Sequence, residues 1–444
     1  MKSIFKAYDI RGEYGSQITE EIARKIGNAF GSFIGSSPIV LGRDVRVSSP
    51  SLCREIQDGI QDAGIDVITV GPVTTPALYY ATGVLGAAGG LMVTASHNPG
   101  KDNGFKLCGR EARPIGIDSG LKDIQLHVES DRYERAGRSG TSSVNDIRRR
   151  YVEHILSFAK AVGPMRIATD TANGMVGTFL PDLLRGLPTV EAKSLFMEPD
   201  GRFPNHEPNP LVPANLDPLR EAVLSMGADL GFAFDGDGDR CAVVDEQGTT
   251  VAGDLLTALI AREVLQRHPG SPIVYDLRSS QVVPEEIRAA GGEPVEEKTG
   301  HSFIKARMRS LDSPFGGELS GHFYFRDNYF ADSGLIAMVE VMVLATRRKG
   351  PFSEIVRPLR RFHTTGEINF RIQDPDAVMA QVEEAFRQES ISRLDGITVR
   401  LEGWWFNLRK SNTEPLVRLN VEGGTRQAME QGLERLLRML GTPI

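Results

Sequence analysis

The sequence predicts an α/β protein with three consecutive, similar mixed α/β domains and a smaller C-terminal α+β domain. The chain has 444 residues, enough for about three domains at roughly 150 residues each. Short apolar runs that end in polar loops alternate with amphipathic helical segments, and this pattern restarts twice. After about residue 361 the order of strands and helices changes.

The first domain is expected over residues 1–142. Its predicted strands are the apolar runs 39–41, 67–70 and 91–93, and each leads into a polar or glycine-containing loop. Loops with a function lie beyond the carboxyl ends of the strands in such sheets. The loop after the third run is therefore a candidate site.

The second and third domains, expected over residues 143–248 and 249–359, repeat the same unit. Each predicted strand is followed by an acidic or glycine-rich loop. The predicted strands are 166–169 and 230–234 in the second domain, and 273–275 and 314–315 in the third. Three sheets of similar organisation are therefore expected.

The C-terminal domain is expected over residues 360–444. Its predicted elements are a strand at 366–372, a helix at 376–389, strands near 397–401 and 416–421, and a helix at 426–440. The domain boundaries are placed in polar or proline-containing segments, at 139–150, 246–248 and 357–361.

Composition and charge exclude several classes of protein. The chain is 40% hydrophobic and 25% charged, as soluble globular proteins are. Its formal net charge of −7 argues against a nucleic-acid binder, which carries a concentrated basic face. No apolar run reaches the 18 residues of a membrane span, and the N-terminus lacks the apolar stretch of a signal peptide. Three scattered cysteines fit a reducing compartment, so a cytoplasmic protein is expected.

The strongest chemical signal is the acidic loop at residues 235–240, which reads DGDGDR. Asp235, Asp237 and Asp239 alternate with glycines, so an extended loop can aim three hard oxygen ligands at one Mg²⁺ ion. A solvated acidic turn is the less favoured alternative. A calcium-binding EF-hand is rejected because its sixth position requires glycine and here holds Arg240.

A second signal follows the predicted strand at 91–93, where residues 94–99 read TASHNP. Ser96, beside His97, is a candidate nucleophile or phosphate carrier, and Lys106 follows within reach. No G-x-S-x-G elbow is present, so a hydrolase triad is not supported.

Two further loops group polar side chains. Residues 317–322 (GELSGH) bring a carboxylate, a hydroxyl and an imidazole together, a set that can hold sugar hydroxyls, although a surface turn is about equally compatible with this pattern. Residues 409–415 (RKSNTEP) combine a guanidinium with hydroxyls and an amide, which predicts an anion cradle. A helix cap beginning at Ser411 is the alternative, but Pro415 argues against it.

In their order and spacing these four loops resemble the α-D-phosphohexomutase superfamily, and residues 5–12 (FKAYDIRG) also fit. The resemblance extends over essentially the whole chain and is strongest to the bacterial phosphomannomutase/phosphoglucomutase branch. It implies a heart-shaped molecule whose four domains surround a central cleft, with one loop from each domain.

The resemblance also implies roles for individual residues. Ser96 would be the phosphoserine, and Mg²⁺ would be held by its phosphate with Asp235, Asp237 and Asp239. Arg240 would contact the serine loop or the transferring group. The residues implied in binding the sugar are Glu318, Ser320 and His322, and those implied in holding the unreacting phosphate are Arg409, Ser411, Asn412 and Thr413.

Other positions match residues that line the active site in the superfamily: Tyr8, Arg11, Lys106 and His301. His97 is also expected to contact the substrate. Lys106 and His301 are the candidates for acid–base catalysis. Relatives commonly place a lysine where this chain has Arg278. A cation remains there for ligand contact, but arginine stays protonated and is a poor proton carrier.

The implied activity is that of an isomerase which interconverts hexose 1-phosphate and hexose 6-phosphate, of mannose and/or glucose. The reaction would use phosphoserine and a hexose 1,6-bisphosphate intermediate, with Mg²⁺ as cofactor and glucose 1,6-bisphosphate (or mannose 1,6-bisphosphate) as activator. The C-terminal domain would close over the substrate about a hinge near residues 357–362. The expected partners are hexose phosphates, without nucleic acid or membrane, and the expected state is a monomer or weak homo-oligomer.

Two alternatives stay open. The first is a phosphoglucosamine mutase, for which the discriminating position is Leu319. That branch typically has glutamine there, whereas the mannose/glucose branch has an apolar residue. The second is a sugar-phosphate-binding protein without turnover, but such a protein would be expected to lose Ser96, a metal aspartate or Arg240, and all are present.

Overall fold

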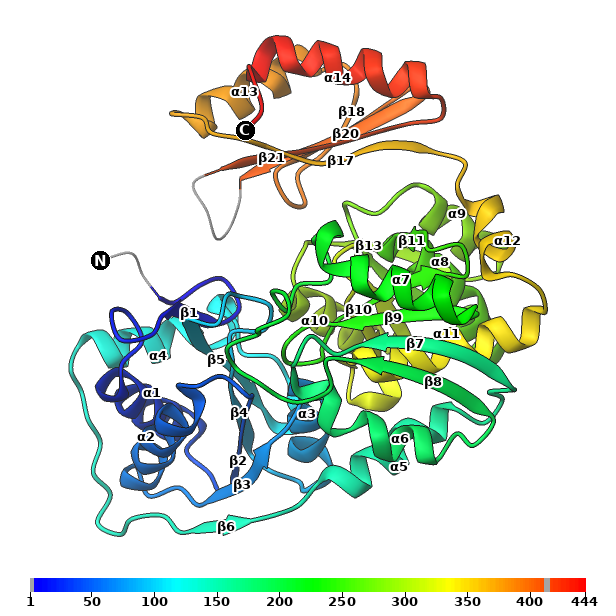
Figure 1. The fold of residues 1–444 in the computed structure, drawn as a ribbon. Helices are drawn as coiled ribbons and strands as arrows, with labels where there is room; N and C mark the ends of the chain where they lie inside the picture. Colours follow the sequence, from blue (N-terminus) through cyan, green and yellow to red (C-terminus); the bar gives the residue numbers. More distant parts are fainter. Residues whose placement is uncertain (1–3, 411–415) are drawn as a thin grey trace.

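The computed structural model describes residues 4–410 and 416–444 (Figure 1). Four β-sheets follow one another along the chain, three mixed and one antiparallel. Helices cover the three mixed sheets, and two helices pack on one face of the C-terminal sheet (Figure 1). The predicted fold class, three α/β domains and a C-terminal α+β domain, is therefore confirmed. The residue numbers assigned to the domain boundaries stay predictions.

The first sheet has the strand order β1-β5-β4-β2-β3-β6. Strands β2, β3, β4 and β6 are parallel, and β5 runs antiparallel to both β4 and β1. The strands are β1 (Ile10–Glu13), β2 (Ile39–Arg43), β3 (Val67–Pro72), β4 (Gly89–Val93), β5 (Asp102–Gly109) and β6 (Ser142–Val144). The helices are α1 (Glu20–Ile34), α2 (Ser49–Asp62), α3 (Thr75–Val84) and α4 (Leu121–Glu129).

The local sequence of helix α1 explains where this helix begins. Its N-cap, Thr19, accepts a hydrogen bond from the backbone N–H of Ile22, and two glutamates in the first turn favour the positive end of the helix dipole. It packs closely on α2 because Gly59 has no side chain. A Cβ at Gly59 would lie 2.1 Å from the carbonyl oxygen of Arg24. This contact closes one face of the first sheet.

The second sheet has the order β11-β10-β9-β7-β8, with β7 parallel to β8 and β9 and with β10 antiparallel to its neighbours. Its strands are β7 (Met165–Asp170), β8 (Val190–Leu195), β9 (Leu230–Phe234), β10 (Cys241–Asp245) and β11 (Thr250–Val251). The helices of this part of the chain are α5 (Arg148–Phe158), α6 (Leu180–Arg185) and α7 (Asp217–Met226).

The third sheet has the order β13-β12-β14-β15-β16, in which β12 is parallel to β13 and β14. Its strands are β12 (Pro272–Asp276), β13 (Glu293–Glu297), β14 (Phe315–Gly317), β15 (Phe323–Phe325) and β16 (Ala331–Asp332). The helices are α8 (Gly253–Arg267), α9 (Val282–Ala289), α10 (His301–Leu311), α11 (Gly334–Arg348) and α12 (Phe352–Val356).

The C-terminal sheet is antiparallel throughout, in the order β17-β21-β20-β19-β18. Its strands are β17 (His363–Phe370), β18 (Ser390–Ser392), β19 (Ile397–Leu401), β20 (Trp404–Lys410) and β21 (Val417–Gly423), and its helices are α13 (Pro375–Ala385) and α14 (Arg426–Leu440). The predictions for β19 and α14 are confirmed. The predicted helix at 376–389 ends four residues early, because the chain turns at Phe386 to form β18.

Strand β20 was not predicted, and it places Arg409 in a strand instead of a loop. Its sequence, WWFNLRK, contains two tryptophans and a phenylalanine, residues that favour strands. Residues 405–408, which are buried, pair with β19 on one side and β21 on the other. In the described structure Arg409 pairs with Arg418 of β21, which restricts where its guanidinium can lie.

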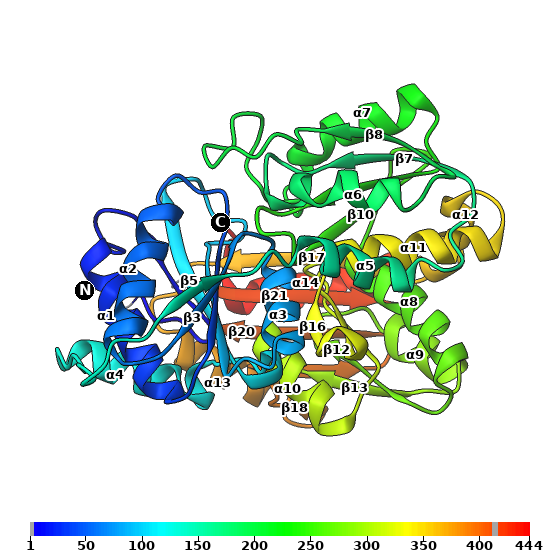
Figure 2. The same cartoon turned by 90° about the horizontal axis from the view of Figure 1, so that it is seen from below.

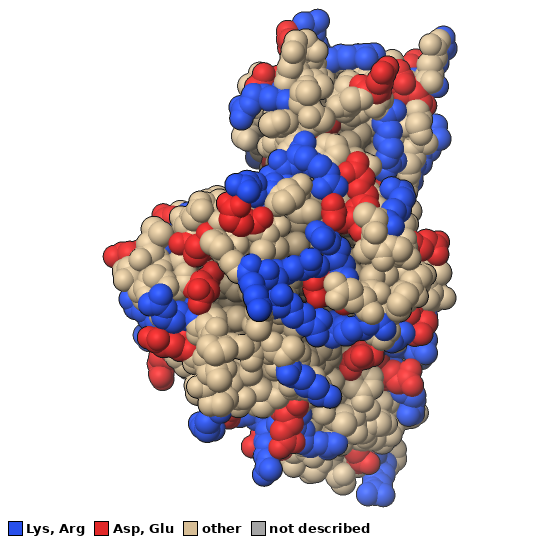
Figure 3. Space-filling model, turned by 90° about the vertical axis from the view of Figure 1, so that its right-hand side faces the viewer, with Lys and Arg blue, Asp and Glu red and all other residues tan. Residues whose placement is uncertain are grey.

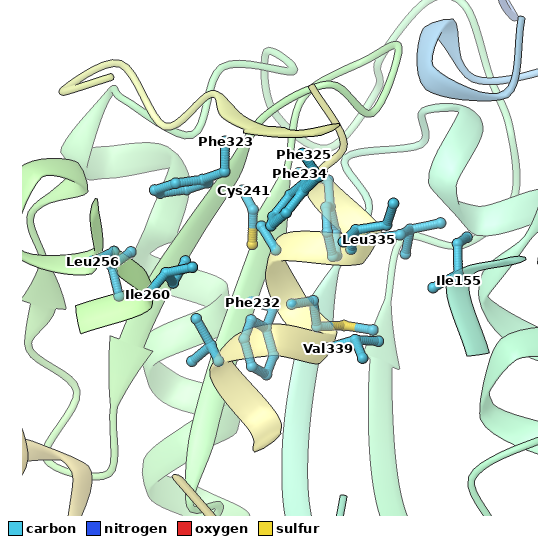
Figure 4. Close-up of a cluster of buried hydrophobic side chains, with 14 of the residues drawn as sticks. Ile155, Phe232, Phe234, Cys241, Leu256, Ile260, Phe323, Phe325, Leu335 and Val339 are labelled. Carbon is cyan, nitrogen blue, oxygen red and sulfur yellow. The ribbon is translucent and has the colours of Figure 1, made fainter. Parts of the chain in front are cut away.

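The three α/β units share a continuous apolar core. One cluster of buried side chains joins residues of all three, such as Met92, Phe232 and Phe315. Figure 4 shows part of it, where Phe232 and Phe234 of β9 lie near Leu335 and Val339 of α11. In contrast, the C-terminal unit has an apolar cluster of its own, formed by residues 370–440. Its core is thus separate from the core that the three α/β units share.

Seen from below, the three α/β units surround the strands of the C-terminal sheet, which lie behind them (Figure 2). One side of the molecule carries mixed charges, with Lys and Arg side chains gathered near its middle (Figure 3). Arginines of α8 and α11 are paired with buried glutamates, as Arg267 is with Glu340 and Arg348 with Glu263. Among the described residues, no helix is long and apolar enough to cross a bilayer.

Candidate active site

Ser96 lies in the loop after β4, at the carboxyl end of the first sheet, and is 1% exposed. Its φ of +53° is in the left-handed region, which non-glycine residues rarely adopt and which is common at functional sites. The backbone N–H of Ser96 donates to Thr94 Oγ1 at 3.0 Å. Its hydroxyl donates to Asp235 Oδ2 at 2.8 Å and lies 3.2 Å from His97 Nδ1.

The three aspartates predicted to bind a metal are brought together. Asp235, Asp237 and Asp239 follow β9, are at most 2% exposed, and each offers an oxygen within 4.8 Å of the others. Burial and the two neighbouring carboxylates raise the pKa of Asp235. Among the described residues, Oδ1 of Asp237 has no hydrogen-bond partner, and Oδ1 of Asp239 lies 3.3 Å from His322 Nε2. Buried carboxylate oxygens beside a serine hydroxyl fit Mg²⁺.

A second group that could hold a metal consists of Asp239, His322 and Asp332. Here a cation is already in place, because Lys305 Nζ lies 2.7 Å from Asp332 Oδ1 and is 2% exposed. Lys106 compensates Asp237 and Asp239 in the same way. What distinguishes the group of Asp235 as the candidate metal centre is the hydroxyl of Ser96, which lies 2.8 Å from Asp235 Oδ2.

Lys106 lies on β5 with its ammonium between two of the aspartates. Its Nζ donates to Asp237 Oδ2 at 2.7 Å and also to Asp239 Oδ2. Burial lowers the pKa of Lys106, but the two carboxylates outweigh burial and raise it. In this arrangement Lys106 is a fixed cation beside the serine loop.

Arg240 connects the acidic loop to the third sheet. Its Nε lies 3.7 Å from Asp235 Oδ2 and 3.4 Å from His322 Nε2. A β-bridge also joins the backbones of Arg240 and His322. Burial and Arg240 lower the pKa of His322, but Asp239 and Glu318 outweigh them and raise it to about 9.

The loop predicted to bind the sugar is held by Glu318, which is 2% exposed. Its carboxylate accepts hydrogen bonds from Ser320 Oγ at 2.7 Å and from Tyr324 Oη at 2.9 Å. Leu319, the residue expected to separate two branches of the superfamily, lines a pocket together with Leu216, Leu256, Arg240 and Ser320.

Four further predicted residues lie around the serine loop. Arg11 donates to Asn98 Oδ1 at 3.0 Å and to Asp9. The ring of Tyr8 packs edge-on against His301, with centroids 5.1 Å apart. Burial lowers the pKa of both His97 and His301 well below the ordinary range.

His301 is a candidate base because its ring nitrogens are available to accept a proton. It is 8% exposed, at the start of α10, and neither ring nitrogen has a hydrogen-bond partner among the described residues. A neutral imidazole has one nitrogen lone pair that can accept a proton, but the burial that lowers the pKa of His301 also makes it a weaker base. A buried, unpartnered imidazole is costly in a core and is the kind of exception that calls for a functional role.

The C-terminal unit contributes a cluster of arginines around one carboxylate. Arg409 Nη2 donates to Glu367 Oε2 at 2.7 Å, and Arg418 Nη1 lies 3.3 Å from Glu367 Oε1. Arg278, of the third sheet, lies 3.9 Å from the same carboxylate and 4.0 Å from Glu318. Arg278 is anchored by Asp276, to which it donates two hydrogen bonds.

Residues from the first three units thus converge on Ser96, and Arg278 links them to Arg409. The predicted residues Ser411, Asn412 and Thr413 lie outside the described residues. Glu367 was missed by the sequence analysis because a single glutamate in a strand carries no signal. Asp276 could have been found, since it follows a predicted strand, as Asp235 does.

A serine opposite a carboxylate triad, on four domains of this kind, defines the phosphohexomutase class. Family models of phosphoglucomutase/phosphomannomutase match the chain in order. The α/β/α domains I, II and III match residues 2–134, 149–248 and 252–362, and the C-terminal domain matches residues 367–439. The chain therefore belongs to the phosphoglucomutase/phosphomannomutase family and is an isomerase, a phosphohexomutase.

Individual relatives agree with this assignment. A phosphomannomutase of Salmonella montevideo is 42% identical over 450 residues and covers 99% of each chain. A phosphohexose mutase of Xanthomonas campestris pv. campestris is 41% identical over 423 residues, which cover 94% of each chain. A solved structure of a family protein from Burkholderia thailandensis superposes with a TM-score of 0.91 at 34% identity, covering 99% of this chain and 97% of that one.

Proposed function

We propose that this phosphohexomutase interconverts the 1-phosphates and 6-phosphates of mannose and glucose, with Ser96 as the phosphate carrier. The observation that carries the proposal is the position of the Ser96 hydroxyl, 2.8 Å from Asp235 Oδ2. A phosphate on that oxygen would lie beside three carboxylates that fit a divalent cation. The 42% identity to a phosphomannomutase supports mannose as one substrate.

In the forward step, the free hydroxyl of a hexose monophosphate attacks the phosphorus of phospho-Ser96. The bond from phosphorus to Ser96 Oγ breaks as the bond to the sugar oxygen forms, which gives a hexose 1,6-bisphosphate. The hydroxyl proton passes to a base. His301 is favoured for this role, since its neutral imidazole has unpartnered nitrogens.

Charge is compensated by residues already in place. Lys106 pairs with Asp237 and Arg240 lies beside Asp235, so both offer cations next to the acidic loop to the transferring phosphoryl group. The metal, when bound by Ser96, Asp235, Asp237 and Asp239, would neutralise negative charge on that group. Phosphoryl transfer depends mainly on such positioning and charge.

The second half of the reaction returns the other phosphate to Ser96. For this the bisphosphate reorients while Arg409 and the neighbouring residues 411–413 hold whichever phosphate is not reacting. Glu318, Ser320 and His322 would bind the sugar hydroxyls in either orientation. Tyr8, Arg11, His97 and Arg278 are proposed to contact the ligand around them. A trace of glucose 1,6-bisphosphate would phosphorylate Ser96 and so activate the enzyme.

The C-terminal unit is proposed to close over the substrate about a hinge near residues 357–362. Its separate apolar cluster and its polar contacts with the third unit support such a motion. Arg400, for example, donates to Glu296 at 2.6 Å, and Glu422 accepts from the backbone of Gln281 at 2.9 Å. Closure would exclude water that could hydrolyse phospho-Ser96.

The runner-up is a phosphoglucosamine mutase. Leu319 lines a pocket together with Arg240 and Ser320, and a leucine side chain offers no hydrogen bond with which to select a C2 substituent. Selection between hexoses must come from hydrogen-bonding groups that face the sugar. Substrate comparison therefore has to decide between the two activities.

A coupled mutase assay with Mg²⁺ and a trace of glucose 1,6-bisphosphate tests the proposal. Mannose 1-phosphate, glucose 1-phosphate and glucosamine 1-phosphate are compared in parallel, with wild type and Ser96→Ala. We expect turnover of the first two and nearly complete loss in Ser96→Ala, with Ser157→Ala as an exposed-serine control. A preference for the glucosamine substrate, or wild-type turnover by Ser96→Ala, would refute the proposal.

A further inference from the structure

Arg46, in the loop between β2 and α2, is a fully buried arginine that the reaction described above does not use. Its exposed fraction is 0%, and it is among the largest fully buried side chains of the described chain. A guanidinium has five N–H donors and stays charged, so burying one is costly unless every donor is satisfied.

All five donors of Arg46 are satisfied, and four of them by one loop. Nε donates to Asp44 Oδ2 at 3.2 Å. The other four donate to the backbone carbonyls of Pro99 (2.6 Å), Asp102 (2.9 Å), Ser96 (2.9 Å) and Asn98 (2.6 Å). The loop that carries the serine is therefore wrapped around a single cation.

This arrangement bears directly on the conformation of Ser96. The φ of +53° at Ser96 is unfavourable for a residue with a Cβ, so it persists only where surrounding contacts impose it. Arg46 binds the carbonyl oxygen of that same residue. The Ser96 hydroxyl, in turn, lies 2.8 Å from Asp235 Oδ2.

Residues of the second unit also pack against Arg46. The ring of Phe203 lies over the guanidinium, 5.3 Å from ring centroid to Cζ. Gly201 packs so closely that a Cβ there would lie 2.5 Å from Arg46 Cα and 2.4 Å from the carbonyl oxygen of Val45. Arg46 is thus held between the serine loop and the unit that supplies Asp235.

We propose that Arg46 is a positioning residue for phosphoryl transfer, which holds the serine loop in the conformation that aims the Ser96 hydroxyl at the carboxylate triad. It touches neither substrate nor metal, and it acts only through the loop. The inference rests on the proposed function, because it assumes that Ser96 carries the phosphate.

The test is Arg46→Lys, which keeps the positive charge beside Asp44 but cannot satisfy four carbonyls in a fixed fork. We expect kcat to fall about 100-fold with little change in KM, because the phosphate donor is displaced while the substrate site is intact. Hydrogen exchange should rise in the peptide covering residues 94–104 and not elsewhere. Incorporation of phosphate from glucose 1,6-bisphosphate, followed by intact mass, should slow in parallel.

The matched control is Arg309→Lys. Arg309 also donates to backbone carbonyls, those of Glu111 and Tyr329, but it lies away from the serine loop. The kcat of Arg309→Lys should therefore equal that of wild type. If Arg46→Lys does not fold, Gly201→Ala is the second variant. It crowds Arg46 from the second unit, and a smaller fall in kcat with the same local rise in exchange is expected.

Ser96→Ala is measured in the same assay so that the two hypotheses are separated. Wild-type kcat in Ser96→Ala would refute the proposed function. Loss in Ser96→Ala together with wild-type kcat and loop exchange in Arg46→Lys would overturn the positioning role alone. A uniform rise in exchange across the whole chain, with KM changed as much as kcat, would also overturn it, because that is the result of a purely structural defect.

Discussion

Ser96 donates a hydrogen bond to Asp235 over 2.8 Å, although the two residues are 139 positions apart and follow strands of different sheets. This contact joins the carboxyl ends of β4 and β9. It depends on the shared apolar core of the first three units, since a shift between those units would separate the two side chains. Four predictions follow from the geometry around this contact and from neighbouring sites.

Removal of divalent cations should abolish turnover, and Mg²⁺ should restore it, because three buried carboxylates otherwise repel one another. Mg²⁺ should also raise the Tm of wild type, since a ligand of the folded state stabilises it. In Asp237→Asn both effects should be largely lost, while Asp217→Asn, an exposed aspartate, should behave as wild type. Full turnover by the chelated wild type would contradict the metal assignment.

His301→Gln should lower kcat by about 100-fold or more and leave KM nearly unchanged, because a general base acts in the transition state. Steady-state kinetics with a hexose 1-phosphate give both constants. The control is His154→Gln, a histidine stacked on Tyr80 away from the site. Equal kcat in the two variants would rule out His301 as the base.

Glu367→Gln should strengthen the binding of phosphate to the C-terminal arginines. The carboxylate of Glu367 now neutralises Arg409, which is 2% exposed, and Arg418. Without that charge the buried guanidinium of Arg409 lacks a counter-ion, which phosphate can supply.

Inorganic phosphate should therefore raise the Tm of Glu367→Gln more than that of wild type, compared at equal ionic strength. Glu383→Gln, on α13 of the same unit, is the control because Glu383 pairs only with the exposed Arg393 in the described structure. Equal shifts in all three proteins would show that Glu367 does not compete with phosphate.

The pair of His206 and Asp170 should stabilise the folded chain at low pH, and this stabilisation should be lost as the pH rises. His206 Nε2 lies 3.0 Å from Asp170 Oδ2. Burial lowers the pKa of His206, but the hydrogen bond and charge of Asp170 outweigh burial and raise it above its ordinary value of 6.5. The contribution is therefore fully present below pH 6.5 and disappears as the pH passes the raised pKa.

Thermal unfolding across about pH 6 to 8 measures this effect. The Tm of wild type should fall more over this range than that of His206→Gln, which cannot be protonated there. Parallel curves for the two proteins would show that the pair adds no pH-dependent stability.

Much of the fold and the chemistry followed from local sequence. Apolar runs that end in polar loops gave the strands β2, β3, β4, β7, β9 and β12, and the loops after them carry Ser96 and Asp235. Alternating residues on an extended loop predicted the carboxylate triad. These features can be predicted from the sequence because strand periodicity and ligand spacing each extend over only a few consecutive residues.

What the sequence alone determined is which residue types stand at the strand ends and, through the resemblance of its loops to the phosphohexomutases, the class of reaction. Only the tertiary structure decided their partners: the five bonds of Arg46 and the pairing of Glu367 with Arg409. Arg409 was expected in a loop and lies in β20, because its place depends on pairing with β21. The bonds from Arg46 to the serine loop and from Arg409 to Glu367 join residues 42 to 56 positions apart, and their geometry is set by how whole sheets pack, for which no local pattern carries information.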